Sequence, residues 1–279
     1  MELPEIVAPR PAAALTWKLT GADAADIAIR TSVDQRITRE WAWSGATGRS
    51  VRVCVVDSGV QGDNPLVGPI QGSHAVVGEG GELAVEGTEA QDVYGHGTAC
   101  ASIIRRIAPE CELFSMRVLG KAGGTGAALL AGLRWAVEQR FDVVNLSLST
   151  TRPRFDHELR TLADQAYFGG TVLVASAHNT PVESFPWRYS SVISVGSHPS
   201  EDPDLVLANT RPPVEFFARG TAVPVAGLDG RPTRNTGNSF ATPHIAGRCA
   251  LILGKHPGLT PFQLKTILYL TSDNVRGGR

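Results

Sequence analysis

From Val51 onward the chain alternates between short apolar runs and longer amphipathic stretches. Strands are predicted where β-branched and apolar residues follow one another, at 51–56, 112–119, 142–148, 171–175, 192–196 and 214–218. Helices are predicted where apolar residues recur every three or four positions, at 95–107, 126–140, 155–168, 239–254 and 260–270. Apolar strands that alternate with helices are typical of a parallel sheet buried on both faces. The pattern therefore predicts an α/β fold with a mostly parallel central sheet and helices on both faces.

Residues 1–50 lack this regularity. They are rich in Ala and Pro at first, and then contain a predicted helix at 22–29 and the pair Trp41 and Trp43. No internal repeat or low-complexity segment follows. We therefore expect an N-terminal extension, residues 1–42, and one folded domain, residues 43–279. The extension is expected to be either a segment packed on the domain or a short propeptide, and the packed segment is preferred.

Composition narrows the class of protein. The chain has 279 residues, of which 42% are hydrophobic, which excludes wholesale disorder. Its 26 basic and 27 acidic residues leave a formal net charge of −1, which argues against a nucleic-acid partner or an anionic membrane surface. No apolar run approaches the 18 residues or so that a membrane span requires. We expect neither nucleic acid nor membrane as a partner.

The four cysteines, Cys54, Cys100, Cys111 and Cys249, match no zinc-ligand spacing. Three of them lie inside apolar runs, where a buried reduced thiol is the usual state. The first residues carry acids where a secretory signal carries basic residues. These observations predict a cytoplasmic protein without a resident metal.

Three residues suited to nucleophilic catalysis stand at the ends of predicted elements. Asp57 ends a strand, while His96 and Ser239 each begin a helix. Taken singly, each has a simpler interpretation: a turn aspartate, a loop histidine and a helix N-cap serine. Together they supply a hydroxyl nucleophile, an imidazole base with a pKa near 6.5, and a carboxylate that orients the base.

The segments around these residues resemble the three signatures of the subtilisin-like serine proteases, the subtilases. They read Asp57-Ser58-Gly59, His96-Gly97-Thr98 and Gly237-Asn238-Ser239-Phe240-Ala241-Thr242-Pro243, in the order of that family. The resemblance extends over residues 43–270. It implies a three-layer subtilisin-like fold and a serine endopeptidase that works through an acyl-enzyme, without a cofactor. An α/β-hydrolase esterase is excluded, because that fold places the serine in G-x-S-x-G, before the acid and the histidine.

The resemblance also implies roles for further residues. Asn179 takes the place of the donor that stabilises the oxyanion. Ser147, Leu148 and Ser149 match the segment that pairs with the substrate backbone, and Gly124, Thr125 and Gly126 match the opposite side of the channel. The implied partner is a peptide or an unfolded protein segment, which binds as an added strand.

The chain departs from the family pattern at several positions. Ser149 and His178 stand where glycine is usual, and both are expected to narrow the primary specificity pocket. This favours restricted, processing-type cleavage. The alternative is a catalytically weak or silent subtilase that acts as a peptide-binding or regulatory module.

Three further expectations concern the surroundings of His96. The helix at 95–107 runs directly into Ala108 and Pro109, which leaves no room for the calcium-binding loop of many subtilases. The acids before His96 (Glu79, Glu82, Glu86, Glu89 and Asp92) are expected to form a solvated loop. Cys100 matches the cysteine of thiol-bearing subtilases, for which inhibition by mercurials is expected, and it is predicted to be an inert buried thiol.

Overall fold

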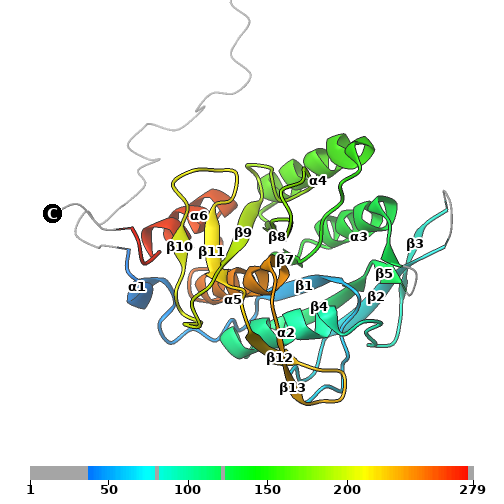
Figure 1. The fold of residues 1–279 in the computed structure, drawn as a ribbon, viewed down its shortest axis with the longest axis horizontal. Helices are drawn as coiled ribbons and strands as arrows, with labels where there is room; N and C mark the ends of the chain where they lie inside the picture. The colour runs from blue at the N-terminus through cyan, green and yellow to red at the C-terminus, as the bar shows by residue number, and fades with distance from the viewer. Residues whose placement is uncertain (1–36, 79–81, 121–122, 276–279) are drawn as a thin grey trace, which may run out of the picture. The chain divides into compact units, whose positions relative to one another are not determined.

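The computed structural model describes residues 37–78, 82–120 and 123–275 (Figure 1). The central strand β1 (Arg52–Asp57) shows how the sheet arises from the sequence. Val53 and Val55 point into one layer of the core, whereas Cys54 and Val56 point into the other. A strand buried on both faces needs apolar side chains at successive positions, and this explains the continuous apolar run.

Within the described residues the main sheet has nine strands. Their spatial order is β10 (Leu207–Ala208), β11 (Phe216–Arg219), β9 (Ile193–His198), β8 (Val172–Ser176), β7 (Val143–Leu146), β1, β4 (Glu112–Arg117), β2 (Gly72–Val77) and β3 (Ala84–Gly87). All neighbours from β11 to β2 pair in parallel, and β10 and β3 pair antiparallel at the two edges. The carboxyl ends of β1, β7 and β8 therefore meet at one edge, where ligands bind in open α/β sheets.

Helices cover both faces of this sheet (Figure 1). On one face α2 (His96–Ile107) packs beside α5 (Asn238–Lys255), with α6 (Pro261–Leu270) and the short α1 (Arg39–Trp43) contributing to the same core. On the other face lie α3 (Gly126–Glu138) and α4 (Asp156–Gly169), the latter preceded by the 3₁₀ turn η1 (Pro153–Phe155). The predicted three-layer α/β fold is confirmed.

Every strand and helix expected between residues 51 and 270 is present within a few residues of its predicted bounds. The elements that the pattern did not predict are edge strands, hairpins and α1. They include β2, β3 and β10, together with the hairpins β5 (Leu119–Gly120) with β6 (Gly123–Gly124) and β12 (Val223–Ala226) with β13 (Pro232–Asn235). The acidic stretch before His96 is not simply a solvated loop, because it contains β3. Glu79 and the helix predicted at 22–29 lie outside the described residues.

The end of the predicted extension packs on the domain. Trp41 in α1 stacks on His256 with ring centroids 4.2 Å apart. Lys255 Nζ donates to the carbonyl of Glu40 over 2.8 Å, and Arg39 pairs with Asp273. These contacts hold α1 against the end of α5. Among the helices described, none is both long and apolar enough to span a bilayer.

Candidate active site

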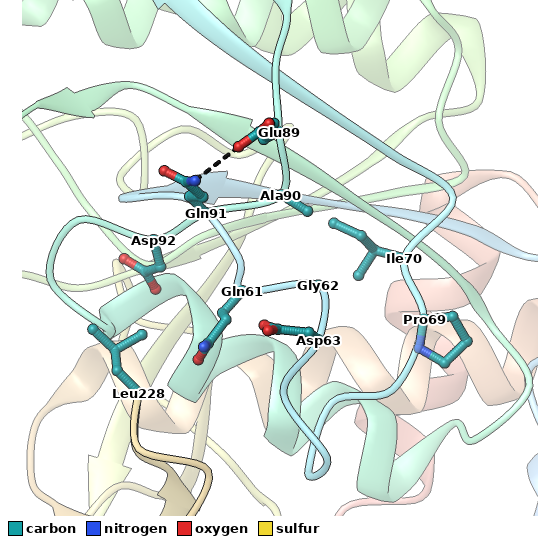
Figure 2. Close-up of a pocket in the computed structure, with 10 residues that line it drawn as sticks. All are labelled: Gln61, Gly62, Asp63, Pro69, Ile70, Glu89, Ala90, Gln91, Asp92 and Leu228. Atoms are coloured by element: carbon teal, nitrogen blue, oxygen red, sulfur yellow. Dashed lines mark hydrogen bonds between the residues drawn. The ribbon is translucent and has the colours of Figure 1, made fainter.

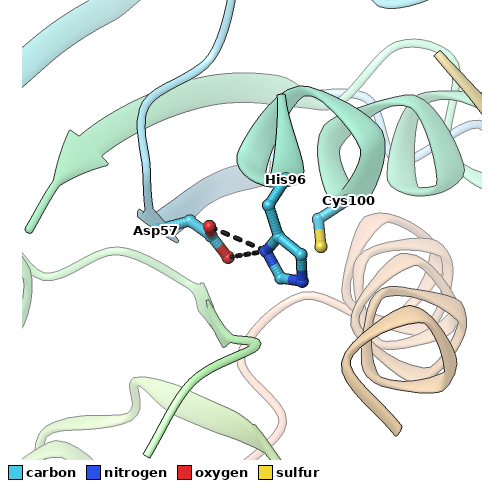
Figure 3. Close-up of side chains that lie close together, drawn as sticks. All are labelled: Asp57, His96 and Cys100. Atoms are coloured by element: carbon cyan, nitrogen blue, oxygen red, sulfur yellow. Dashed lines mark hydrogen bonds and ion pairs between the residues drawn. The ribbon is translucent and has the colours of Figure 1, made fainter. Parts of the chain in front are cut away.

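Asp57 and His96 form a hydrogen-bonded pair at the carboxyl edge of the sheet (Figure 3). The Asp57 side chain is fully buried, and its two oxygens lie 2.8 and 2.9 Å from Nδ1 of His96. Burial lowers the pKa of His96, but the nearby carboxylates of Asp57 and Asp92 outweigh it and leave the pKa above its usual 6.5. The pair orients the imidazole and leaves Nε2 as the nitrogen that can exchange a proton with substrate.

The start of α2 fits closely against the turn after β1. A Cβ atom on Gly97 would lie 2.0 Å from the carbonyl oxygen of Gly59 and 3.1 Å from Cβ of Asp57. Only glycine allows the helix to approach β1 this closely, and the approach brings His96 onto Asp57. Close packing against β1 therefore requires glycine at Gly97, directly after His96.

Asp92 organises this helix start, and the sequence analysis missed that role. Its Oδ1 accepts from Ser58 Oγ at 2.7 Å and from the backbone N–H of Gly95 at 2.8 Å. Its Oδ2 accepts from both the N–H and the hydroxyl of Thr98, each at 2.7 Å. A carboxylate at a helix N-terminus is stabilised by the free N–H groups there. The sequence contains one signal for this role, an aspartate six residues before a threonine in the predicted helix.

Ser239, the second residue of α5, lies next to these residues. The ring of Phe240 lies 5.2 Å from the ring of His96, centroid to centroid. One turn along α2, the Cys100 thiol points toward the Ser239 carbonyl, 3.6 Å away. Within the described residues no hydrogen bond joins His96 to Ser239, and catalytic contacts of this kind often close only when substrate binds. Asp57, His96 and Ser239 thus lie together although they are far apart in the sequence.

Asn179 lies beside Ser239. A Cβ placed on Gly237 would be 3.3 Å from Ser239 Oγ and 3.6 Å from Asn179 Nδ2, so the hydroxyl and the amide flank one point. Asn179 Oδ1 accepts from the N–H of Asn238 over 2.9 Å, which leaves Nδ2 as the outward donor. The side chain of Asn238 in turn bonds to Ser197 N and to the carbonyls of Ala177 and His178.

The segment 147–149 follows β7 at the same edge. The side chain of Ser147 is buried and donates to the Ser239 carbonyl over 2.8 Å, so it supports the start of α5. Leu148 and Ser149 are partly exposed. On the other rim, Thr125 caps α3 by accepting from Ala128 N, and Gly124 belongs to the β5–β6 hairpin.

Tyr94 fixes that hairpin near His96. Its hydroxyl donates to the carbonyl of Gly120 over 2.6 Å and accepts from Gly123 N over 3.1 Å. Since Tyr94 is two residues before His96, the glycine-rich edge leading to Gly126 is tied to the start of α2. The two segments expected to bind substrate are therefore both attached to the elements that carry the candidate site.

His178 is partly buried, and its Nδ1 accepts from the N–H of Thr180 over 3.1 Å. Together with Asn179 and Asn238 it lines a cavity of about 490 Å³, whose wall also includes Trp187. Ser149 is not among the residues that line this cavity. Ser149 and His178, the two residues that stand where glycine is usual in the family, thus lie in different surroundings.

Two further cavities flank the site. One, about 680 Å³, is lined by Asp63, Ile70, Glu89 and others, and Asp92 is the residue it shares with the start of α2 described above (Figure 2). A second, about 450 Å³, is lined by His96 and Phe240 and by residues of the β12–β13 hairpin. A side chain bound in this second cavity would lie directly against the imidazole.

Asp57, His96 and Cys100 offer ligand atoms within 4.8 Å of one another, as Figure 3 shows. Burial raises the pKa of the Cys100 thiol well above its usual value, and the charge of Asp57 adds to that rise. The neutral thiol is a poor metal ligand and a poor nucleophile. The hydrogen bonds between Asp57 and His96 account for the short distances between these two side chains.

Comparison with known proteins agrees with this geometry. Residues 48–279 match the model of the Subtilase family. The chain is 30% identical to Subtilisin DY of Bacillus licheniformis over 83% of its length and 86% of that protein, and 31% identical to Subtilisin of Bacillus pumilus over 82% and 86%. Its fold matches the crystal structure of a cold adapted subtilisin-like serine proteinase with a TM-score of 0.62 and 27% identity, covering 79% of this chain and 81% of that one. The chain therefore belongs to the subtilase family and is a serine endopeptidase.

Proposed function

We propose that this endopeptidase cleaves peptide bonds with Ser239 as nucleophile, His96 as general base and Asp57 as the group that orients His96. The observation that carries the assignment is the contact of both oxygens of buried Asp57 with His96 Nδ1, at 2.8 and 2.9 Å, beside the start of α5. This contact fixes the tautomer with Nε2 free and stabilises the imidazolium that forms.

The reaction then runs in two halves. Ser239 Oγ attacks the scissile carbonyl carbon while His96 Nε2 takes its proton, and the tetrahedral intermediate collapses as the C–N bond breaks and the amine leaves with that proton. Water next attacks the acyl-enzyme and gives its proton to His96. The ester bond breaks, the carboxylic acid product leaves, and the proton returns to Ser239.

Asn179 is proposed as the oxyanion donor. Its Oδ1 is held by Asn238 N at 2.9 Å, so its Nδ2 keeps one orientation before substrate arrives. Donors that are fixed in advance stabilise developing charge without reorganising. The N–H groups at the start of α5 add to this field.

We further propose that the substrate is an extended peptide that lies between the segments 124–126 and 147–149. Their attachment to the elements of the site supports this, since Tyr94 ties one to His96 and Ser147 ties the other to Ser239. His178 and Ser149 are proposed to restrict the residues that are accepted. A peptide library digested by the full chain tests this: a few dominant cleavage motifs support it, and cleavage after most residue types contradicts it.

Labelling with a fluorophosphonate probe tests the assigned chemistry. The wild-type chain should be labelled, and Ser239→Ala should not. Because the probe needs a working nucleophile and base rather than a matching substrate, it separates catalysis from specificity. Absence of labelling above the Ser239→Ala control would favour the peptide-binding module instead.

Residues 43–279 are proposed as the catalytic domain and residues 1–42 as an extension that packs on it rather than a propeptide. The contacts of α1 with His256 and Lys255 support packing for the end of this segment. Intact-mass analysis of the purified active protein tests the proposal. A mass equal to the full chain supports it, and loss of the first 42 residues contradicts it.

A cytoplasmic location is proposed as well. All four cysteines are buried free thiols, the form that a reducing compartment maintains. Fractionation of cells that express the natural gene, followed by immunodetection, tests the location. Recovery in the medium contradicts the proposal.

A further inference from the structure

Three arginines donate to backbone carbonyls in β12 and in the bend just before it. Arg219, at the end of β11, donates from Nη2 to the carbonyl of Ala222 over 3.2 Å, and Arg234 in β13 donates from Nη1 to the same carbonyl over 3.0 Å. Arg106, near the end of α2, donates from Nη1 to the carbonyl of Pro224 over 3.0 Å. Arg219 and Arg234 thus share one acceptor, and the acceptor of Arg106 lies two residues further along the chain. The three guanidinium groups are therefore neighbours.

This cluster has no negative counterpart. No carboxylate in residues 37–78, 82–120 or 123–275 forms an ion pair with Arg106, Arg219 or Arg234. Burial and the charge of Arg219 together lower the pKa of Arg106, which shows that the two like charges act on each other. Since Arg219 is only 8% exposed, its charge lies largely out of water without a carboxylate partner in the described residues.

Buried nitrogens without partners lie in the same region. Arg219 Nε has no hydrogen-bond partner in the described part of the chain, and the same holds for Nε2 of His244 and Nδ1 of His198. Arg219 and His198 are register partners on the adjacent strands β11 and β9, so their side chains share a face of the sheet. His244 is fully buried, and the charges of Arg106 and Arg219 both act on its pKa.

We propose that Arg106, Arg219 and Arg234 form a binding site for a small oxyanion of the phosphate or sulfate type. Guanidinium forks match the oxygens of such ions and can bind each with two parallel hydrogen bonds. Arg219 forms the buried base of the site, while Arg106 and Arg234, both exposed, form its open rim. A single oxyanion bound between them would balance the charge that the fold has gathered there.

The site is connected to the start of α5. Gly220, the residue after Arg219, accepts a hydrogen bond from Gly237 N over 2.8 Å, and Gly237 precedes Ser239 by two residues. The strands β12 and β13 also line the cavity against His96. An anion held across β11, α2 and β13 would therefore stiffen the segment that positions the proposed nucleophile.

Calorimetric titration of inorganic phosphate into the full-length Ser239→Ala chain tests this site. That background prevents self-digestion, and the measurement does not depend on proteolysis, so it can fail or succeed independently of the proposed mechanism. Sodium chloride keeps the ionic strength constant. We expect saturable binding at one site, and at least about tenfold weaker binding when Arg106→Gln and Arg234→Gln are combined. Both substitutions are at exposed positions, so folding should be retained.

The matched control combines Arg211→Gln and Arg231→Gln, which removes the same charge from exposed side chains that make no hydrogen bond in the described residues. It should leave phosphate affinity within about twofold. Equal weakening by both pairs, no saturable binding, or equal binding of chloride would overturn the proposal. A phosphoserine peptide in place of phosphate distinguishes the source: tighter binding supports a phosphorylated chain as the ligand, and weaker binding supports the free ion.

Discussion

The backbone N–H of Asn238 donates to Oδ1 of Asn179 over 2.9 Å, and this bond decides which way the Asn179 amide faces. Asn238, which directly precedes the proposed nucleophile Ser239, therefore orients the proposed oxyanion donor Asn179. The side chain of Asn238 reinforces the link by bonding to the carbonyls of Ala177 and His178.

Asn179→Ala should lower kcat by about 100- to 1000-fold and change KM little, the magnitude known for the corresponding donor in subtilisin. Steady-state kinetics on a peptide substrate measure both constants. Asn238→Ala keeps its backbone N–H and so should lose much less. A loss confined to KM would show that Asn179 binds substrate without stabilising the transition state.

The rate should depend on pH through His96. The carboxylates of Asp57 and Asp92 keep the pKa of His96 above 6.5 despite burial, and only the neutral imidazole can act as a base. Activity should therefore rise with pH, with the midpoint of the acidic limb of kcat/KM above 6.5. In Asp92→Asn one of these charges is lost, so the midpoint should move down. A midpoint at or below 6.5 in the wild-type chain would contradict this.

Asp92→Ala should destabilise the fold by roughly 3 kcal/mol, because several hydrogen bonds to one carboxylate are lost at the start of α2. Urea unfolding followed by fluorescence gives the value. Glu89→Ala, at an exposed position on the same segment, is the comparison and should cost less than about 0.5 kcal/mol. Similar losses in the two variants would mean that Asp92 is not the anchor.

Acid should destabilise the protein through His244. Burial, together with the charges of Arg248, Arg106 and Arg219, lowers the pKa of His244 to about 3. Between pH 6.5 and 3 the unfolded state thus holds one more proton than the folded state. The free energy of unfolding should consequently fall with decreasing pH by about 1.4 kcal/mol per unit from this group, whereas its contribution is complete above pH 6.5.

His244→Asn is the variant that isolates this group, because the asparagine amide can still donate to the carbonyl of Phe240, as Nδ1 does at 2.9 Å. Urea unfolding at several pH values between 4.5 and 6.5 should show a slope reduced by that amount. An unchanged slope would assign the acid sensitivity to other groups.

Chelation of calcium should leave the melting temperature unchanged if the calcium loop of other subtilases is missing here. The structure agrees with the sequence at this place, since α2 continues without interruption to Ile107 and Ala108 caps it. Melting curves with and without a chelator measure the effect. A decrease in melting temperature of several degrees would reveal a calcium site elsewhere.

The sheet could be predicted because its strands are buried on both faces. In β8 every residue from Val172 to Ser176 is buried, so the sequence there is almost entirely apolar. In β13, by contrast, the residues Pro232–Asn235 are mostly exposed and hydrophilic, and hairpin pairing alone makes them a strand. Hydrophobic periodicity indicates which residues are buried. It does not predict a strand that forms through hydrogen bonds while its side chains stay exposed.

The same contrast applies to the candidate site. Asp57, His96 and Ser239 stand in short motifs that can be recognised in the sequence. Asp92, by contrast, acts through the backbone amides of a helix start and the hydroxyl of distant Ser58, and Asn238 acts through backbone groups of distant segments. Ser147 shows the limit most clearly, because its buried side chain donates to the Ser239 carbonyl, a contact that the motif does not indicate. Such roles depend on which backbone amides remain unpaired, and that is decided only by the folded arrangement.

The position of β1 in the middle of the sheet has a consequence for how activity is lost on heating. Asp57 is the last residue of a strand that is hydrogen-bonded to β4 on one side and to β7 on the other. Displacing the backbone that carries this carboxylate requires the ladders in the middle of the sheet to open, which takes global unfolding. The β12–β13 hairpin forms a separate two-stranded sheet outside the main one and can open locally. Heat should thus first disturb the wall that this hairpin contributes to the cavity beside His96, and the orientation of His96 should persist until global unfolding.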